Sequence, residues 1–164
     1  MTPKRNLSIQ IYNRQRRYPI CRRNLQIYTS WVMEQVRRMK PDNAWSEVVL
    51  VLTRDRGMIT YQKACFGRDN TTDVISQRYL PMPPESDSLV GEVIVNLDAA
   101  EARNASEGRS RELARYILHG CLHLANMEDA TVQERAAMRR RETAWLRRAE
   151  SGPLMYPLME SARS

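Results

Sequence analysis

The sequence has few cysteines and no long apolar segment. Its three cysteines, Cys21, Cys65 and Cys121, are odd in number, and no two of them stand at a C-x-x-C spacing. This pattern indicates neither a disulfide framework nor a cysteine zinc site. No window approaches the ~20 apolar residues that a membrane span needs, and the basic N-terminus lacks the apolar region of a signal peptide. We therefore expect a cytoplasmic protein with reduced cysteines and no membrane partner.

Low-complexity tracts and internal repeats are also missing, which excludes disordered and solenoid classes. The 164 residues are 42% apolar and 27% charged, which is enough material of ordinary composition for one core. The sequence predicts a single domain over residues 1–150. Residues 151–164, "SGPLMYPLMESARS", contain two prolines and no periodicity, and predict an irregular extension. We expect this extension to dock through Leu154, Tyr156 and Leu158.

Acidic residues are the minority charge. Lys and Arg number 26 against 19 Asp and Glu, and Arg strongly outnumbers Lys. Guanidinium groups match phosphate with a bidentate fork, so this balance favours a nucleic-acid partner. A solvated basic surface would give the same net charge, and charge alone leaves both interpretations open.

Hydrophobic periodicity predicts an α+β fold, with a mixed sheet of about four strands covered by helices. The continuous apolar run "EVVLVLT" is typical of a central strand that is covered on both faces. Gly67 suits a left-handed helix cap, and the prolines of residues 78–88 indicate an exposed loop. The predicted strands span residues 7–13, 47–53, 72–77 and 90–96, and the predicted helices span residues 21–39, 58–66, 97–105, 110–125 and 131–148.

The stretch "HGCLHLANMED", residues 119–129, contains the only two histidines of the chain. His119 and His123 stand one helical turn apart, where Cβ atoms lie roughly 5 to 6 Å from each other and both imidazoles reach one ion at ~2.0 to 2.1 Å. Asn126 suits a left-handed turn after the helix, which would bring Asp129 back as a third ligand. Three protein ligands with an open fourth position are typical of a catalytic zinc site.

Two alternatives accompany this metal site, which the sequence places near the C-terminal side of the fold. The offsets match the metallopeptidase pattern H-E-x-x-H-x-x-G-x-x-H, but Gly120 stands where the general-base glutamate belongs, so peptidase chemistry is disfavoured. His119 and His123 could also be partly buried helical histidines with ordinary hydrogen bonds. Their spacing, together with Asp129 at the expected offset, favours the metal.

Three segments together resemble the bacterial YbeY family. "HGCLHL" is similar to the family's H-G-x-L-H-L, "TTDVIS" to its P-T-D-V-L-S-F strand and "VGEVIVN" to its L-G-D-I-x-I strand, in the same order. The order of elements agrees from about residue 7 to residue 149, including Glu134, Met138 and Glu142 on the last helix. The resemblance implies a metal-dependent, single-strand-specific endoribonuclease of 16S rRNA 3′-end maturation and ribosome quality control, which acts on rRNA and the small ribosomal subunit. It also implies one Zn²⁺ or another divalent transition metal.

The chain departs from the family pattern at two places. Asn126 replaces the turn glycine and Asp129 the third histidine, and the added negative charge predicts a higher pKa for metal-bound water. Cys65 and Phe66 occupy the positions of a Tyr-Arg pair whose arginine is implied to handle phosphate. We hypothesise that Arg68, two residues on, supplies a substitute guanidinium. The expected catalytic residues are therefore His119, His123, Asp129 and Arg68, with the first three as metal ligands.

Several charged residues have more than one interpretation. Thr72 and Asp73 match a T-D pair of the family, and structural capping is favoured over a role in orienting a histidine. Glu92 has no assigned role. The departures from the family pattern at Phe66 and Asp129 also motivate an alternative function, a catalytically weak RNA- or ribosome-binding assembly factor. The sequence does not indicate an oligomeric state. Further arginines either hold RNA phosphates or form solvated faces, and these are Arg54, Arg56, Arg139, Arg140 and Arg141.

Overall fold

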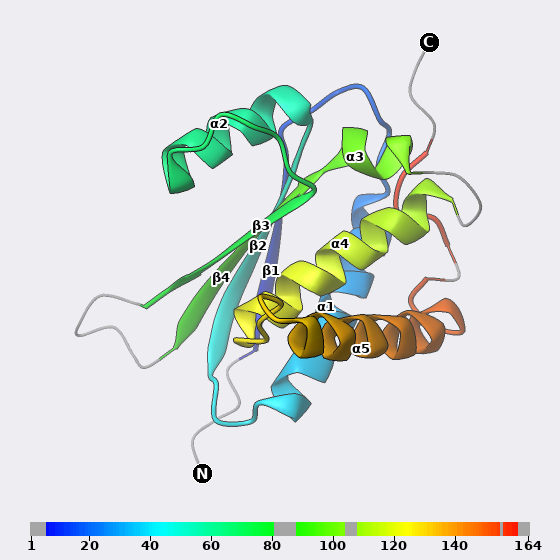
Figure 1. The fold of residues 1–164 in the computed structure, drawn as a ribbon. Coiled ribbons are helices and arrows are strands. Elements are labelled where there is room, and N and C mark those ends of the chain that lie inside the picture. Colours follow the sequence, from blue (N-terminus) through cyan, green and yellow to red (C-terminus); the bar gives the residue numbers. More distant parts are fainter. Residues whose placement is uncertain (1–5, 81–87, 104–107, 155, 161–164) are drawn as a thin grey trace.

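The computed structural model describes residues 6–80, 88–103, 108–154 and 156–160. Each predicted strand and helix is present, with ends shifted by a few residues; the central part of the predicted loop over 78–88 and the end of the predicted 97–105 helix lie outside the described residues. The elements are shown in Figure 1 and are, in chain order, β1 (Ser8–Asn13), α1 (Arg22–Met39), β2 (Trp45–Thr53), α2 (Asp55–Phe66), β3 (Val74–Tyr79), β4 (Leu89–Asn96), α3 (Leu97–Ala102), α4 (Arg109–Leu124) and α5 (Val132–Glu150).

The strands form one four-stranded sheet in the order β1-β2-β4-β3. β1, β2 and β4 run parallel, and the edge strand β3 pairs antiparallel with β4. This arrangement confirms the predicted α+β fold with a mixed sheet. The predicted left-handed cap after α2 is confirmed as well, because Gly67 has φ 64°.

Alternate residues of the central strands face opposite layers of helices. Val93 and Val95 of β4 belong to the core under α1 and α4, whereas Ile94 packs with Val51 and Met58 on the side of α2 (Figure 1). α5 packs on α4 as an outer layer. Burial on both faces explains why β2 reads as an unbroken apolar run.

The loop before β3 is fixed to the end of β4. The Asn96 backbone N–H donates to the Asp73 carbonyl at 2.9 Å, and the Asn96 side-chain amide donates to the Thr72 carbonyl at 3.1 Å. Asn96 is fully buried, so these bonds replace the solvation that its polar groups lose. The position of Asp73 near α4 follows from this anchoring.

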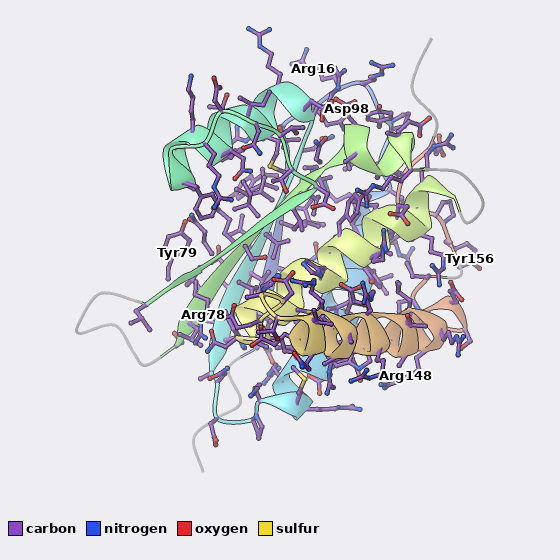
Figure 2. The ribbon with its side chains drawn as sticks, viewed as in Figure 1. Arg16, Arg78, Tyr79, Asp98, Arg148 and Tyr156 are labelled. Atoms are coloured by element: carbon purple, nitrogen blue, oxygen red, sulfur yellow. The ribbon has the colours of Figure 1, made fainter. Side chains whose placement is uncertain are left out.

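Residues after α5 return to the core. Leu158 and Met159 are buried, Leu154 packs against the core, and a β-bridge joins Met159 to Ile20. Docking through Leu154 and Leu158 is thus confirmed. The expectation for Tyr156 is wrong, because its side chain is 67% exposed and projects from the surface (Figure 2). None of the helices in the described part of the chain is both long and apolar enough to cross a membrane.

Candidate metal centre

α4 places both histidines near its C-terminal end, beside its buried stripe. Leu113, Ile117 and Cys121 of this stripe are fully buried, whereas His119 and His123 are partly exposed. Burial raises the pKa of the Cys121 thiol to about 12, so this sulfur stays protonated. Cys121 is not part of the metal-ligating cluster, as the helical spacing predicts.

The chain reverses directly after α4 through a residue in left-handed conformation. Asn126 has φ 62°, and its backbone N–H donates to the His123 carbonyl at 2.9 Å. The Met127 N–H donates to the Leu122 carbonyl at 3.1 Å and closes the turn. The prediction for Asn126 is confirmed, and the turn returns Asp129 toward the helix end.

The side chains of His119, His123 and Asp129 converge on one point. The two Nε2 atoms lie 2.9 Å apart, and Asp129 Oδ2 lies 3.5 Å from each of them. Tetrahedral ligands at ~2.1 Å from an ion are separated by about 3.4 Å, so the donor set fits a metal with little adjustment. The three side chains are 25%, 27% and 41% exposed, which leaves an open approach. These residues could therefore hold a metal ion.

Glu142 of α5 orients the first histidine. Its carboxylate lies 2.5 Å from His119 Nδ1 and is 9% exposed, so the opposite nitrogen, Nε2, faces His123 and Asp129. Burial disfavours a charged His119, but the hydrogen bond to Glu142 and the negative charges of Glu142, Asp129 and Asp73 outweigh it, and the pKa of His119 is raised. A surrounding that favours a proton here also favours a metal cation.

Replacing Glu142 by alanine is expected to weaken metal binding by about 10- to 100-fold, because His119 would lose the partner that fixes its ring and tautomer. Isothermal titration of the purified protein with Zn²⁺ measures the change in Kd. Glu150→Ala is the matched control, since Glu150 is also on α5 but pairs with Arg111. Equal Zn²⁺ affinities in the Glu142 variant and the wild type would contradict this role.

Gly120 allows α4 to lie close against β3 and β4. The Ser76 hydroxyl donates to the Gly120 carbonyl at 2.8 Å, and a Cβ at residue 120 would stand only 2.6 Å from Val93 Cγ1. A glutamate at this position has no space, which agrees with the expectation against peptidase chemistry.

A cleft of about 190 Å³ opens beside His119 and Asp129. Arg115 stands one turn before His119 on α4, and Arg135 and Arg139 lie on the same side of α5 as Glu142. The cleft thus joins a metal-ligating cluster to guanidinium groups. Its lining consists of Asp73, Val74, Arg103, Arg115, Tyr116, His119, Asp129, Arg135, Met138, Arg139 and Glu142.

The structure does not bring Arg68 into this cleft. Its guanidinium carbon lies 5.8 Å from the centroid of the Phe66 ring, beyond the end of α2. Arg54 pairs with Asp98 at 3.1 Å, so this arginine is engaged within the fold. Glu92 accepts a hydrogen bond from Tyr79 and does not line the cleft. A catalytic role of Arg68 stays a prediction.

Sequence reasoning missed that Glu142, Arg115 and Arg135 lie at this site. Glu142 was identified only as a residue that matches the family pattern. The signal for Arg115 was its position four residues before His119, which places both side chains on one face of a helix. No comparable signal in the sequence predicts that Glu142 and Arg135 of α5 lie beside α4, because the contact between the two helices is tertiary.

Comparison with known proteins identifies the family of this chain. The sequence model of the family described as Endoribonuclease YbeY matches residues 10–150. This chain belongs to that family. The match confirms the resemblance that the three segments carry.

Individual relatives share this family name. Endoribonuclease YbeY of Anaeromyxobacter dehalogenans is 36% identical over 107 residues, which cover 64% of this chain and 54% of the relative. That of Elusimicrobium minutum is 38% identical over 97 residues, covering 56% and 66% of the two chains, and one from Chlorobium phaeobacteroides is 28% identical over 141 residues, covering 76% and 93%. The matches to the two Anaeromyxobacter YbeY proteins thus span only about half of their length.

A solved structure supports the fold. The solution structure of TM1509 from Thermotoga maritima superposes with a TM-score of 0.53 at 20% identity, over 87% of this chain and 89% of that chain. At this identity the likeness concerns the fold and not the chemistry of the site.

Proposed function

We propose that this chain is a metal-dependent endoribonuclease that holds one Zn²⁺ through His119, His123 and Asp129. The observation that carries the proposal is the convergence of these three ligand atoms within 4.8 Å at an arginine-lined cleft. Membership of the YbeY family supports an RNA phosphodiester as the substrate. The positive net charge of +7 suits such a polyanion.

The residues of the site have two roles, which are to hold the ion and to orient its ligands. When bound, the ion supplies Lewis acidity, which activates water and polarises a phosphate oxygen. His119 Nε2, His123 Nε2 and Asp129 Oδ2 would hold the ion. Glu142 keeps the proton of His119 on Nδ1, so that the lone pair of Nε2 is directed to the cluster.

Other groups of the cleft are suited to hold the phosphodiester. Arg139 presents its guanidinium group beside the metal cluster, and so does Arg115, one of whose guanidinium nitrogens pairs with Glu112 at 2.7 Å. Guanidinium binds phosphate oxygens through parallel hydrogen bonds. The buried Tyr116 hydroxyl has no hydrogen-bond partner among the described residues. Burial and the negative charges of Glu112 and Asp73 raise the pKa of Tyr116 to about 12, so the hydroxyl stays protonated. It therefore remains a potential donor at the cleft wall.

The finer assignment rests on the family resemblance. We propose single-stranded RNA as the substrate, and the 3′ end of 16S rRNA on the small ribosomal subunit as its site in the cell, with a part in ribosome quality control in the cytoplasm. A cleft open to solvent on one side supports access by an unpaired strand.

Removal of the metal tests the proposal directly. The purified protein is expected to contain about one zinc per chain by elemental analysis and to cleave a labelled single-stranded RNA. A chelator should abolish cleavage, and added Zn²⁺ should restore it, because the ligands have no other means of activating water. Cleavage that survives complete metal removal would refute a metal-dependent mechanism.

A second candidate is an RNA- or ribosome-binding assembly factor with weak or no cleavage. It is favoured by Phe66 in the position of the family's arginine, and by Arg68, which lies outside the cleft. Tight RNA binding without chelator-sensitive cleavage, even at raised pH, would support it. The variant Arg68→Ala tests whether Arg68 replaces the family's arginine. Unchanged cleavage and RNA affinity would exclude Arg68 as the substitute guanidinium.

A further inference from the structure

The outer side of α5 carries a basic surface beside the metal cleft. We define the arginine face as Arg139, Arg140 and Arg147 together with the small side chains of Ala136, Thr143 and Ala144, which line a shallow groove along the helix. All three arginines are exposed. The face is therefore available to a partner from solution.

The guanidinium groups of this face are not used within the fold. Among the residues that the structure describes, no ion pair and no side-chain hydrogen bond involves Arg139, Arg140 or Arg147. Neighbouring arginines differ, since Arg148 donates to Gln35 at 2.8 Å and Arg135 donates to the Ala130 carbonyl, also at 2.8 Å. Contacts within the fold therefore do not explain why three unpaired arginines stand together on this face.

Within α5, no exposed acidic side chain between Arg135 and Arg148 offsets the face. Between Arg135 and Arg148, Glu142 is the only carboxylate of α5, and it is buried and turned toward His119. An exposed helix that is stable for reasons of folding alone usually interleaves both charge signs at i,i+4 spacing. This face presents positive charge alone, which fits a polyanion.

The arginine face continues directly from the cleft. Arg139 lines both the cleft and the groove of the face. Arg140 and Arg147 are seven residues apart, or about 10.5 Å along the helix axis, and only small side chains lie between them. A strand held in the cleft can therefore extend over this face with its phosphates near successive guanidinium groups.

We propose that the arginine face binds the sugar-phosphate backbone of the RNA strand where it leaves the metal cleft. This inference rests on the proposed RNA substrate. Contacts to phosphate add affinity without sequence preference, so the face extends the binding site and does not select the cleavage position.

The double variant Arg140→Gln with Arg147→Gln tests the face. The matched control is Arg16→Gln with Arg23→Gln, which removes the same charge from exposed positions, with Arg16 at the opposite end of the molecule from α5 (Figure 2). Binding of a labelled single-stranded RNA is measured in a chelator, to prevent cleavage, over a range of salt concentrations. We expect the face variant to bind roughly tenfold more weakly at low salt, with a salt slope that is flatter by about 1.4 for two lost phosphate contacts. The control should change much less.

The outcomes separate this inference from the proposed function. Equal RNA affinity and salt slope in the face variant and the wild type would overturn the inference, even if chelator-sensitive cleavage is present. Equal losses in the face and control pairs would also overturn it, because they would reflect net charge alone. Weaker RNA binding in the face variant only, without any cleavage by the wild type, would support the face and refute the nuclease.

Two further measurements test whether the double variants are as stable as the wild type and whether the face binds a membrane surface. Thermal unfolding of both double variants should match the wild type, since all four side chains are exposed. Vesicles that contain phosphatidylserine are tested in parallel. Loss of vesicle binding in the face variant with RNA binding intact would assign the face to a membrane surface and overturn the proposal.

Discussion

Replacing Asp129 by alanine is expected to remove the bound metal and to lower RNA cleavage by more than about 100-fold, since loss of even an outer partner of a metal ligand costs about 10- to 100-fold. The variant leaves only the two imidazoles, whose Nε2 atoms lie 2.9 Å apart. Two protein ligands fall short of the three that catalytic zinc sites use. Elemental analysis and a cleavage assay on the same preparation measure both effects.

A neighbouring carboxylate provides the control for this experiment. Glu128 is exposed and adjacent in sequence, but it does not belong to the metal-ligating cluster, so Glu128→Ala should retain metal and activity. Full zinc occupancy in the Asp129→Ala protein would show that Asp129 is not a ligand and would remove the basis of the proposed site.

Asp129→His provides the converse test. Histidine stands at this position in the family pattern, and a neutral imidazole adds no negative charge to the site. Metal should therefore be retained and cleavage near neutral pH should increase, because less ligand charge lowers the pKa of the water that the ion activates. Lower cleavage in the histidine variant, with metal still bound, would indicate that the carboxylate has a role beyond ligation.

Gly120→Ala is expected to lower the free energy of unfolding by about 1 to 3 kcal/mol. The added Cβ would lie 2.6 Å from Val93 Cγ1, 2.9 Å from Ser76 Oγ and 3.1 Å from Val74 Cγ2. Two of these neighbours are stiff β-branched side chains of the sheet, so α4 itself must move. Since His119 adjoins this glycine, we expect weaker metal binding as well.

Urea unfolding and Zn²⁺ titration measure these two effects of Gly120→Ala. Gly152→Ala is the matched control, because a Cβ there would meet only carbonyl oxygens at 3.7 and 3.8 Å. Alanine favours a helix over glycine by about 1 kcal/mol, which acts against the expected loss at residue 120. A Gly120→Ala protein as stable as the wild type would show that α4 can withdraw from the sheet at little cost.

The elements of the fold could be predicted because their signals are local. Apolar residues at period two marked β1, and an unbroken apolar run marked β2, which the structure covers on both faces. The left-handed conformations of Gly67 and Asn126 followed from residue types that tolerate positive φ. Predicting these two conformations required no knowledge of long-range contacts.

The arginines could not be placed in the same way. Arg68 is close in sequence to the missing family arginine, yet the end of α2 holds it beside Phe66 and outside the cleft. Arg115 and Arg135 received no prediction, although both line the cleft. The position of a residue in the chain does not show whether its side chain faces a site, because the direction of a side chain depends on how whole helices and strands pack.

By itself, the sequence predicted the three residues that could hold a metal, since the helical period fixes His119 and His123 one turn apart and the turn at Asn126 returns Asp129. Only the tertiary structure decided how that set is oriented and what surrounds it. Packing of α5 on α4 brings Glu142 to His119, and close approach of α4 to the sheet excludes a side chain at Gly120. The physical reason is that helix geometry repeats over a few residues, whereas contacts between elements depend on the packing of the entire core.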